Sequence, residues 1–264
     1  MEDMKNRNWQ PDLEPLVREA GRILLSFWGT KLTHTFKGIY GFATEADLAS
    51  EKYLIAALHK LFPQASICAE ENGNYGSPSS DYQWVIDPLD GTTNFAHGLS
   101  HFCISVALCY QDRPIVGIIY NPMADELYYA QEGKGAFLNG QKLAVTEVKE
   151  TREVLVACSL PYGSRKKFDT LKLIEKVVQH GYGVRHYGAA ALDLAYVAAG
   201  RFDGLVLVGL SWWDVAAGAV LISEAGGMIS DFSGEPLSSD YSDCLAGGKS
   251  VFEGLKSILG RNIK

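Results

Sequence analysis

Hydrophobic residues recur every three or four positions in two early stretches of the chain, residues 12–28 and 44–62. This spacing predicts two amphipathic helices. The second begins with Thr44-Glu45-Ala46-Asp47, which resembles a capping box that has Asp47 in the position usually held by glutamate. Asp47 is therefore either a helix-capping acid or part of a functional site, and the local pattern leaves both interpretations open.

Short apolar runs predict buried strands at residues 66–69, 84–86, 103–109, 115–120 and 127–130. The first run is followed directly by Glu70 and the second by Asp87. Residues 73–81 are rich in Ser, Gly and Pro, so we expect a loop there that folds back. Because consecutive strands tend to pair, this loop would bring Glu70 beside Asp87.

Strands and helices alternate after a charged segment near residue 147. The patterns predict strands at 154–158, 183–187 and 203–208 and helices at 168–180 and 189–199. Such alternation is typical of α/β layering, here with mixed strand directions. We expect a single domain over residues 1–264, divided softly into an antiparallel subregion, 1–146, and an alternating subregion, 147–264.

A last helix is expected to begin at Asp214 and to stop at Gly226-Gly227. Asp214 is either the N-cap of this helix or a further acid that a distant segment delivers to a site. The small residues Ala216, Ala217 and Gly218 would let the helix pack closely against its neighbours.

Composition narrows the class of protein. The chain has 264 residues, of which 47% are hydrophobic and 21% charged, and its net charge is -7. The longest basic run is Arg165-Lys166-Lys167, which argues against a nucleic-acid surface. No apolar stretch is long enough to span a membrane, and the polar N-terminus lacks a signal-peptide core. Five cysteines without a Cys-x-x-Cys pair favour reduced thiols, so we expect a soluble cytoplasmic protein.

Candidate chemistry centres on residues 84–95, Trp-Val-Ile-Asp-Pro-Leu-Asp-Gly-Thr-Thr-Asn-Phe. Asp87 and Asp90 surround Pro88, which we expect to end the strand. Crowded carboxylates raise each other's pKa, and a divalent cation such as Mg²⁺ with its preference for oxygen ligands would remove that cost. The following Gly-Thr-Thr turn would present backbone N–H groups to a phosphate. The alternative is a plain surface turn, because Asp, Pro and Gly all favour turns.

Motifs of several other enzyme classes are absent from the sequence. None of the cysteines belongs to a Cys-x5-Arg phosphatase loop, and Gly-x-Ser-x-Gly, His-Glu-x-x-His and Gly-x-Gly-x-x-Gly do not occur. Residues 247–250, Gly-Gly-Lys-Ser, lack the first glycine of a P-loop because position 243 is Asp. The six histidines are scattered, which argues against zinc.

Residues 84–95 resemble the first signature of the inositol monophosphatase family, whose members are magnesium-dependent, lithium-sensitive sugar phosphatases. Residues 213–227, which begin Trp-Asp-Val-Ala-Ala-Gly, resemble its second signature. Two further acidic motifs of the family are matched by residues 44–47 and 69–71. The four motifs occur in the family's order along nearly the whole chain. The resemblance implies the α/β/α/β/α sandwich of the inositol monophosphatase and fructose-1,6-bisphosphatase type, usually as a homodimer.

The resemblance also implies a cofactor, two to three Mg²⁺ ions, with Li⁺ as an inhibitor. One ion would take Glu70, Asp87 and the backbone carbonyl of Leu89. A second would be held by Asp87, Asp90 and Asp214, and a third, weaker one by Glu70 and waters. Such ions stabilise the attacking and leaving oxygens and lower the pKa of the attacking water.

Catalytic roles at Glu70, Asp47 and Thr92 follow from the same resemblance, with Thr92 and Asp47 orienting and deprotonating the water. Substrate binding is implied for Asp90, Gly91, Thr92, Ala190 and Asp193. Animal members hold ring hydroxyls with a glutamate shortly before the second signature, whereas residues 205–208 here, Leu-Val-Leu-Val, contain no acid. This departure argues against a strict preference for myo-inositol, while Asn94-Phe95 favours the inositol branch.

The sequence therefore predicts a magnesium-dependent phosphomonoesterase acting on inositol monophosphate or a similar small polyol phosphate through metal-activated water. One alternative is a relative with broader specificity for fructose bisphosphate, a nucleotide 3′-phosphate or NADP. Another is a binding protein of the transcription machinery that keeps phosphatase activity. The acidic chain gives no support for direct RNA contact, and neither a membrane nor a nucleic-acid partner is expected.

Overall fold

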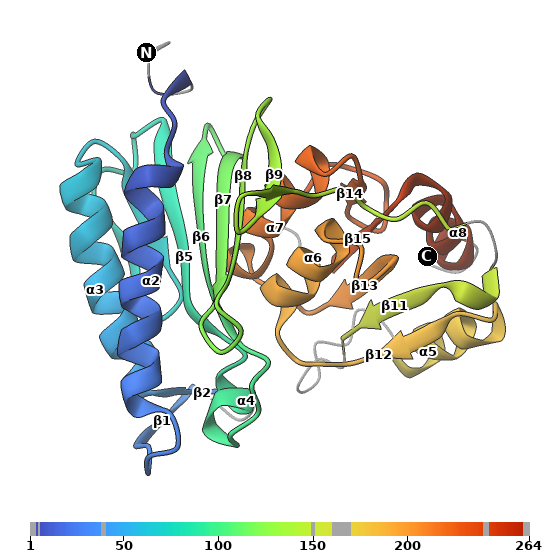
Figure 1. Cartoon of the computed structure of the whole chain (residues 1–264), viewed down its shortest axis with the longest axis horizontal. Coiled ribbons are helices and arrows are strands. Elements are labelled where there is room, and N and C mark those ends of the chain that lie inside the picture. Colours follow the sequence, from blue (N-terminus) through green and yellow to red (C-terminus); the bar gives the residue numbers. More distant parts are fainter. Residues whose placement is uncertain are drawn as a thin grey trace.

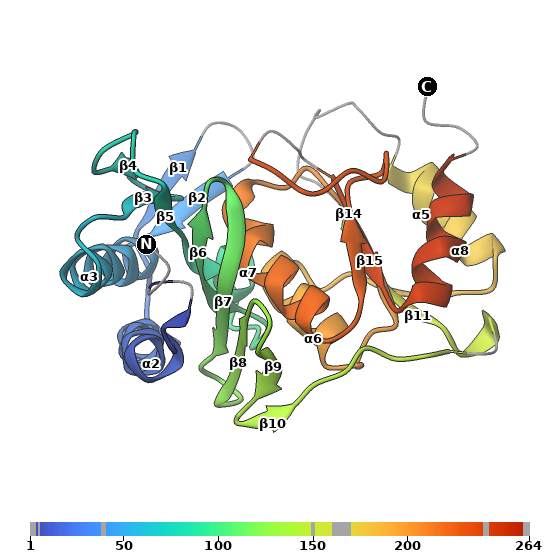
Figure 2. The same cartoon turned by 90° about the horizontal axis from the view of Figure 1, so that it is seen from above.

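The computed structural model describes residues 4, 6–37, 41–148, 151–159, 170–239 and 243–260, so the basic run 165–167 lies outside it. Its elements stack in layers (Figures 1 and 2). An outer helix pair covers an eight-stranded sheet, a second pair separates this sheet from a five-stranded one, and a third pair covers the far side. The pairs are α2 (Gln10–Phe27) with α3 (Glu45–Leu61), α6 (Ala190–Ala198) with α7 (Trp212–Glu224), and α5 (Thr170–Gln179) with α8 (Lys249–Gly260). The predicted α/β/α/β/α sandwich is confirmed.

The larger sheet has the order β10-β9-β8-β7-β6-β5-β3-β4. Its strands are β3 (Ser66–Ala69), β4 (Gly73–Tyr75), β5 (Tyr82–Asp90), β6 (Cys103–Tyr110), β7 (Arg113–Asn121), β8 (Glu126–Gln131), β9 (Gly135–Leu138) and β10 (Gln141–Lys142). All neighbours are antiparallel except β3 and β5, which are parallel. The expected strands are confirmed. The expected loop at 73–81 is wrong in its first three residues, because they form β4.

Strand β6 shows why the central runs are almost entirely apolar, with Ser105 as the one polar residue between Cys103 and Cys109. Its alternate residues Ile104, Val106 and Leu108 pack with residues of α2 and α3, whereas Cys103 and Ala107 pack with residues of α6 and α7. A strand that is covered on both faces has no solvent side, so it reads as a continuous hydrophobic run instead of an alternation.

The expectation that Pro88 ends its strand is wrong. Strand β5 continues to Asp90, which pairs with Cys103, and the register shifts between Asp87 and Asp90. A residue without a backbone N–H is tolerated at such an irregularity because no ladder hydrogen bond is required of it. The shift leaves two buried acids at the end of one strand.

The smaller sheet has the order β12-β11-β13-β15-β14. Its strands are β11 (Leu155–Cys158), β12 (Gly183–Arg185), β13 (Gly204–Val208), β14 (Met228–Ser230) and β15 (Asp243–Gly247). Pairs β11–β12 and β11–β13 are parallel and the others antiparallel, which confirms mixed directions. One apolar core joins both sheets through α6 and α7. This shared core supports our proposal that residues 1–264 form a single domain.

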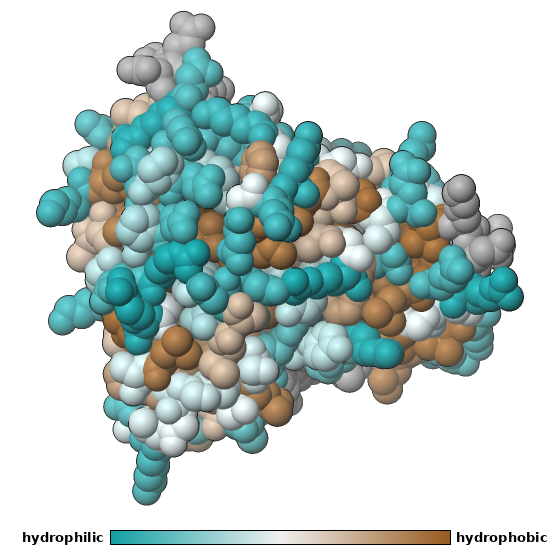
Figure 3. Space-filling model, viewed as in Figure 1, coloured by the Kyte–Doolittle hydropathy of each residue, from teal (hydrophilic) through white to brown (hydrophobic). Residues whose placement is uncertain are grey.

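The face in Figure 3 shows hydrophobic residues in separate patches among hydrophilic ones. None of the described helices is both long and apolar enough to cross a membrane. The five cysteines are all free thiols, of which only Cys68 is partly exposed. A two-stranded sheet, β1 (His34–Lys37) and β2 (Gly41–Thr44), lies at the same end of the large sheet as α4 (Thr92–Ala96) (Figure 1).

Candidate functional site

The candidate site lies where β3 and β5 end and where α3, α4, α6 and α7 begin. The parallel pairing of β3 with β5 places Ala69 opposite Ile86, and the Glu70 amide donates to the Ile86 carbonyl at 3.2 Å. Glu70 and Asp87 therefore leave neighbouring strand ends side by side. The structure confirms the neighbouring strands that the chain order predicted.

Asp87 is the acid at the centre of this group. It is 2% exposed, and its Oδ1 accepts the Leu89 amide at 3.0 Å. Burial raises the pKa of Asp87 well above its usual range, and the negative charges of Glu70, Asp90 and Asp214 raise it further. Acids from three separate segments therefore act on one buried carboxylate.

Asp90 lies against the first turn of α6. Its Oδ1 accepts the Ala190 amide at 3.0 Å, and its Oδ2 accepts those of Ala191 and Leu192 at 2.8 and 3.2 Å. These helix N-terminal N–H groups would otherwise lack partners, and the helix dipole favours a negative charge there. Burial nevertheless raises the pKa of Asp90 to about 6.

Asp47 combines the two roles that its sequence left open. Its Oδ2 accepts the Thr44 amide at 2.7 Å and closes the capping box at the start of α3. Its Oδ1 accepts the Thr92 hydroxyl at 2.8 Å, so the same carboxylate reaches α4. Burial raises the pKa of Asp47 despite these hydrogen bonds.

Asp214 stands at the third helical position of α7. Ser211 is the N-cap, and its amide donates to Asp214 Oδ2 at 2.7 Å in a capping box. The expectation of an N-cap Asp at 214 is therefore wrong, although a capping role is present. Helix α7 packs against β5, and the negative charge of Asp214 contributes to the raised pKa of Asp87.

Lys37 and Glu71, neither of which was predicted as a site residue, also belong to this region. The Lys37 ammonium lies 2.9 Å from Glu70 Oε1 and 2.5 Å from Glu71 Oε1. The Glu71 side chain is 3% exposed, and burial followed by the charge of Glu70 raises its pKa to about 7. Buried Glu51 holds the adjacent loop through the Glu71 amide at 2.8 Å and the Asn72 amide at 3.0 Å.

Gly91 connects the acids to α4. Its φ of +91° lies in the left-handed region, and an added Cβ would lie 2.9 Å from the His101 carbonyl and 3.2 Å from Ala189 Cβ. Only glycine suits this position. The half-buried Thr92 follows at the start of α4, and its hydroxyl also lies 3.1 Å from the Leu89 carbonyl.

Asp193 and Ala190 come from the first turn of α6. Ala190 is partly exposed, whereas Asp193 is 2% exposed and its Oδ1 lies 3.0 Å from Nε2 of His101. His101 was not selected from the sequence either, because nothing near it in the chain indicates a partner 92 residues away.

Within the part of the chain that the structure describes, no three His, Cys, Asp or Glu side chains stand ready to hold a metal ion. Three of the acids accept other donors: Lys37 for Glu70, α6 amides for Asp90, and a cap amide for Asp214. The donor set nevertheless fits Mg²⁺ in kind, because it consists of carboxylate and carbonyl oxygens. The metal ligands stay a prediction.

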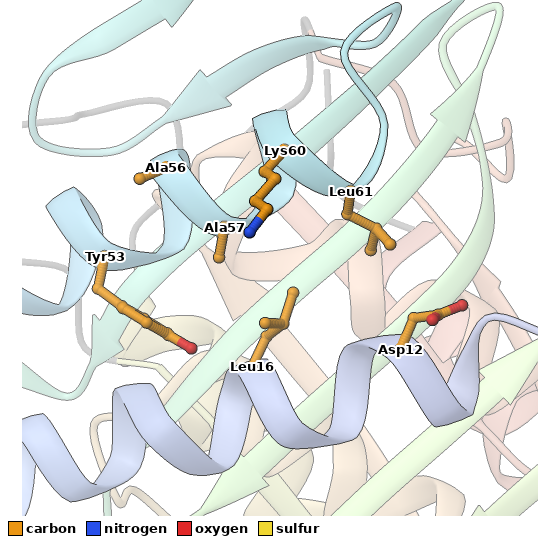
Figure 4. A pocket seen from close by; sticks show the side chains of 7 residues that line it. All are labelled: Asp12, Leu16, Tyr53, Ala56, Ala57, Lys60 and Leu61. Atoms are coloured by element: carbon orange, nitrogen blue, oxygen red, sulfur yellow. The ribbon is translucent and has the colours of Figure 1, made fainter.

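A groove elsewhere on the molecule lies between α2 and α3 (Figure 4). Leu16 and Tyr53 extend between the two helices, and Asp12 and Lys60 supply its charges. None of the acids described above lines it, so it is separate from the candidate site.

The free energy of unfolding should fall as pH rises from about 5 to about 7 when no divalent cation is added. Glu71 and Asp90 have pKa values of about 7 and about 6 in the fold, above those of an unfolded chain. In that window the folded protein still binds protons that the unfolded chain has released, so raising the pH favours unfolding. Urea unfolding across the window would measure the slope, and Glu71→Gln should reduce it. A slope that is flat or rising in the wild type, or unchanged in the variant, would contradict the stated cause.

The inositol monophosphatase family profile matches residues 7–262. The chain is 41% identical over 221 residues to the Nus factor SuhB of Salmonella typhimurium, covering 83% of each chain. It is 40% identical over 236 residues to the inositol-1-monophosphatase of Mesorhizobium japonicum, covering 88% of this chain and 89% of that one. The crystal structure of the extragenic suppressor protein suhB from Bartonella henselae superposes with a TM-score of 0.91 at 34% identity, covering 96% and 99% of the two chains.

Proposed function

Because the chain belongs to the inositol monophosphatase family, a family of phosphatases, we propose that it is a magnesium-dependent phosphomonoesterase acting on inositol monophosphate or a similar small polyol phosphate. The observation that carries the proposal is the position of Asp87. It is buried near the end of β5, shortly before Gly91 and Thr92, and its pKa is raised by burial and by the charges of three further acids. Crowding ionised carboxylates in a buried site costs free energy, and a bound cation would offset that cost in place of protons.

The residues proposed to hold Mg²⁺ are Glu70, Asp87, Asp90, Asp214 and the carbonyl of Leu89. Bound there, two to three ions would supply a water of lowered pKa and neutralise charge on the phosphoryl group. The protein's own part is to gather the oxygens. A cation that displaced the Lys37 ammonium would release the Glu70 carboxylate from its present partner.

Thr92 and Asp47 are proposed to handle the proton of the attacking water. The Thr92 hydroxyl donates to Asp47 Oδ1, which leaves its oxygen lone pairs to accept from a water on the other side. A proton that arrives at Thr92 Oγ1 passes on to Asp47, whose raised pKa suits a base. Glu70 would act on the same water from the strand end.

Gly91 and Thr92 are proposed to bind the phosphate through their amides at the start of α4. Asp90 and the Ala190 backbone would contact the leaving group, with buried Asp193 behind them. No acid occupies residues 205–208, so a preference for small polyol phosphates is proposed without strict selection of myo-inositol. We further propose a cytoplasmic homodimer that contacts neither membrane nor nucleic acid directly.

Phosphate release from a panel of esters tests this function. The panel contains inositol 1-phosphate, fructose 1,6-bisphosphate, adenosine 3′,5′-bisphosphate and NADP, each with Mg²⁺, with EDTA, and with Mg²⁺ plus Li⁺. We expect Mg²⁺-dependent, Li⁺-inhibited release that is fastest with the inositol ester. Even rates over the panel would replace the polyol preference with broad specificity, and no release from the folded protein would contradict a phosphatase.

A second candidate function is association with the transcription machinery, because a relative at 41% identity bears the name Nus factor. The two functions do not exclude each other. Recovery of RNA polymerase or ribosomal proteins from lysate by the tagged protein, but not by a bead control, would support it, and failure to recover either would end it.

A further inference from the structure

His101 lies at a junction of segments that the proposed reaction must hold together. Its backbone carbonyl lies over Gly91 and accepts the Asn94 side-chain amide at 2.7 Å. The same amide donates to the Tyr187 carbonyl at 2.7 Å. The residue is therefore fixed against both the start of α4 and the segment that leads into α6.

The His101 side chain continues this connection into α6. Its Nε2 lies 3.0 Å from Asp193 Oδ1, and its ring packs against those of Tyr187 and Tyr196 at centroid distances of 4.8 and 5.4 Å. The side chains of His101 and Asp193 are 16% and 3% exposed, so water competes weakly for the hydrogen bond between them. Removing either partner would leave the other as a buried polar group without its hydrogen bond, which costs free energy.

Asp193 lies within the same helical turn that presents its amides to Asp90. We propose that His101 is a positioning residue: through Asp193 it fixes the first turn of α6, and thereby sets where the Ala190 backbone meets the leaving group. Asp193 then acts behind the binding surface instead of touching the substrate. This inference deepens the proposed function and rests on it for its kinetic test.

The kinetic test compares a polyol ester with an ester that has no polyol to position. His101→Leu should raise KM for inositol 1-phosphate about 10-fold, with kcat within about threefold, because a contact worth one hydrogen bond loses its fixed geometry. KM for p-nitrophenyl phosphate should change less than about twofold. His101→Gln, which keeps a donor toward Asp193, should restore most of the difference. If His101→Leu does not fold, the shorter polar His101→Asn takes its place.

Hydrogen exchange tests the same inference without any activity. The amides of residues 190–192 should lose protection in His101→Leu and keep it in His101→Gln, with α2 unchanged as the internal reference. A wild type that hydrolyses no ester would end the proposed function while exchange still decides the role of His101. Unchanged protection in His101→Leu, an equal rise in KM for both esters, or a Gln variant no better than Leu would overturn the positioning role.

Discussion

Asp87→Asn should lower kcat by roughly 10³-fold, since several kcal/mol of transition-state charge stabilisation correspond to three tenfold steps in rate. Asp87 is the proposed bridging ligand, and the neutral side-chain amide of asparagine offers no negative charge to a cation. The fold should survive, because Asn keeps an Oδ1 that can accept the Leu89 amide. The variant should also unfold at a temperature equal to or above that of the wild type without metal, because a buried carboxylate with a raised pKa has been removed. Phosphate release and thermal unfolding measure the two effects.

Asp231→Asn is the matched control. Asp231 is a 3% exposed acid, outside the acid group, whose Oδ1 accepts the Glu235 amide at 2.7 Å. It should keep wild-type turnover and gain no stability in EDTA. An Asp87→Asn variant that retained most of the wild-type rate would refute the bridging role, whereas one that lost its fold would refute the isosteric argument.

Much of this site could be predicted from the sequence because its geometry is local. Asp87, Leu89, Asp90 and Gly91 lie close together at a single strand end, and Glu70 directly follows β3, the next strand along the sheet. Hydrophobic runs locate such strand ends well when both faces of the sheet are covered. Asp47 could not be assigned to one role from its pattern because the structure gives it two.

The parts that the sequence did not predict depend on contacts between distant or exposed segments. Strand β1 is exposed at every position, so it carries no hydrophobic pattern, and the reach of Lys37 to Glu70 has no local sign. His101 meets Asp193 only after two layers have packed. Strand β15 enters its sheet between strands that precede it in the chain, which no local period indicates. The strand end predicted at Pro88 is wrong for a different reason. The register shift between Asp87 and Asp90 means that no backbone N–H is required at that position.

Gly117→Ala should cost about 3 kcal/mol of unfolding free energy, the upper part of the usual range for overpacking. Helix α7 crosses β7 so closely that an added Cβ at Gly117 would lie 2.3 Å from the Ala217 carbonyl oxygen. The obstacle is backbone, so no side-chain rotation relieves it, and α7 has to move away from the sheet. Asp214 lies in the first turn of this helix, so activity should fall along with stability. Urea unfolding and phosphate release are the measurements.

Gly41→Ala provides the control, because its added Cβ would meet no atom closer than 3.7 Å. The free energy of unfolding of this variant should change by less than about 1 kcal/mol, the usual difference between glycine and alanine within a strand. Gly218→Ala tests the packing of α7 on its other side. The added Cβ would lie 2.5 Å from Leu194 Cβ of α6. Alanine also favours the helical conformation over glycine by about 1 kcal/mol, which offsets part of the cost. We therefore expect a smaller loss than at Gly117. A Gly117→Ala protein as stable as Gly41→Ala would show that α7 does not rest on β7 as closely as the layered packing requires.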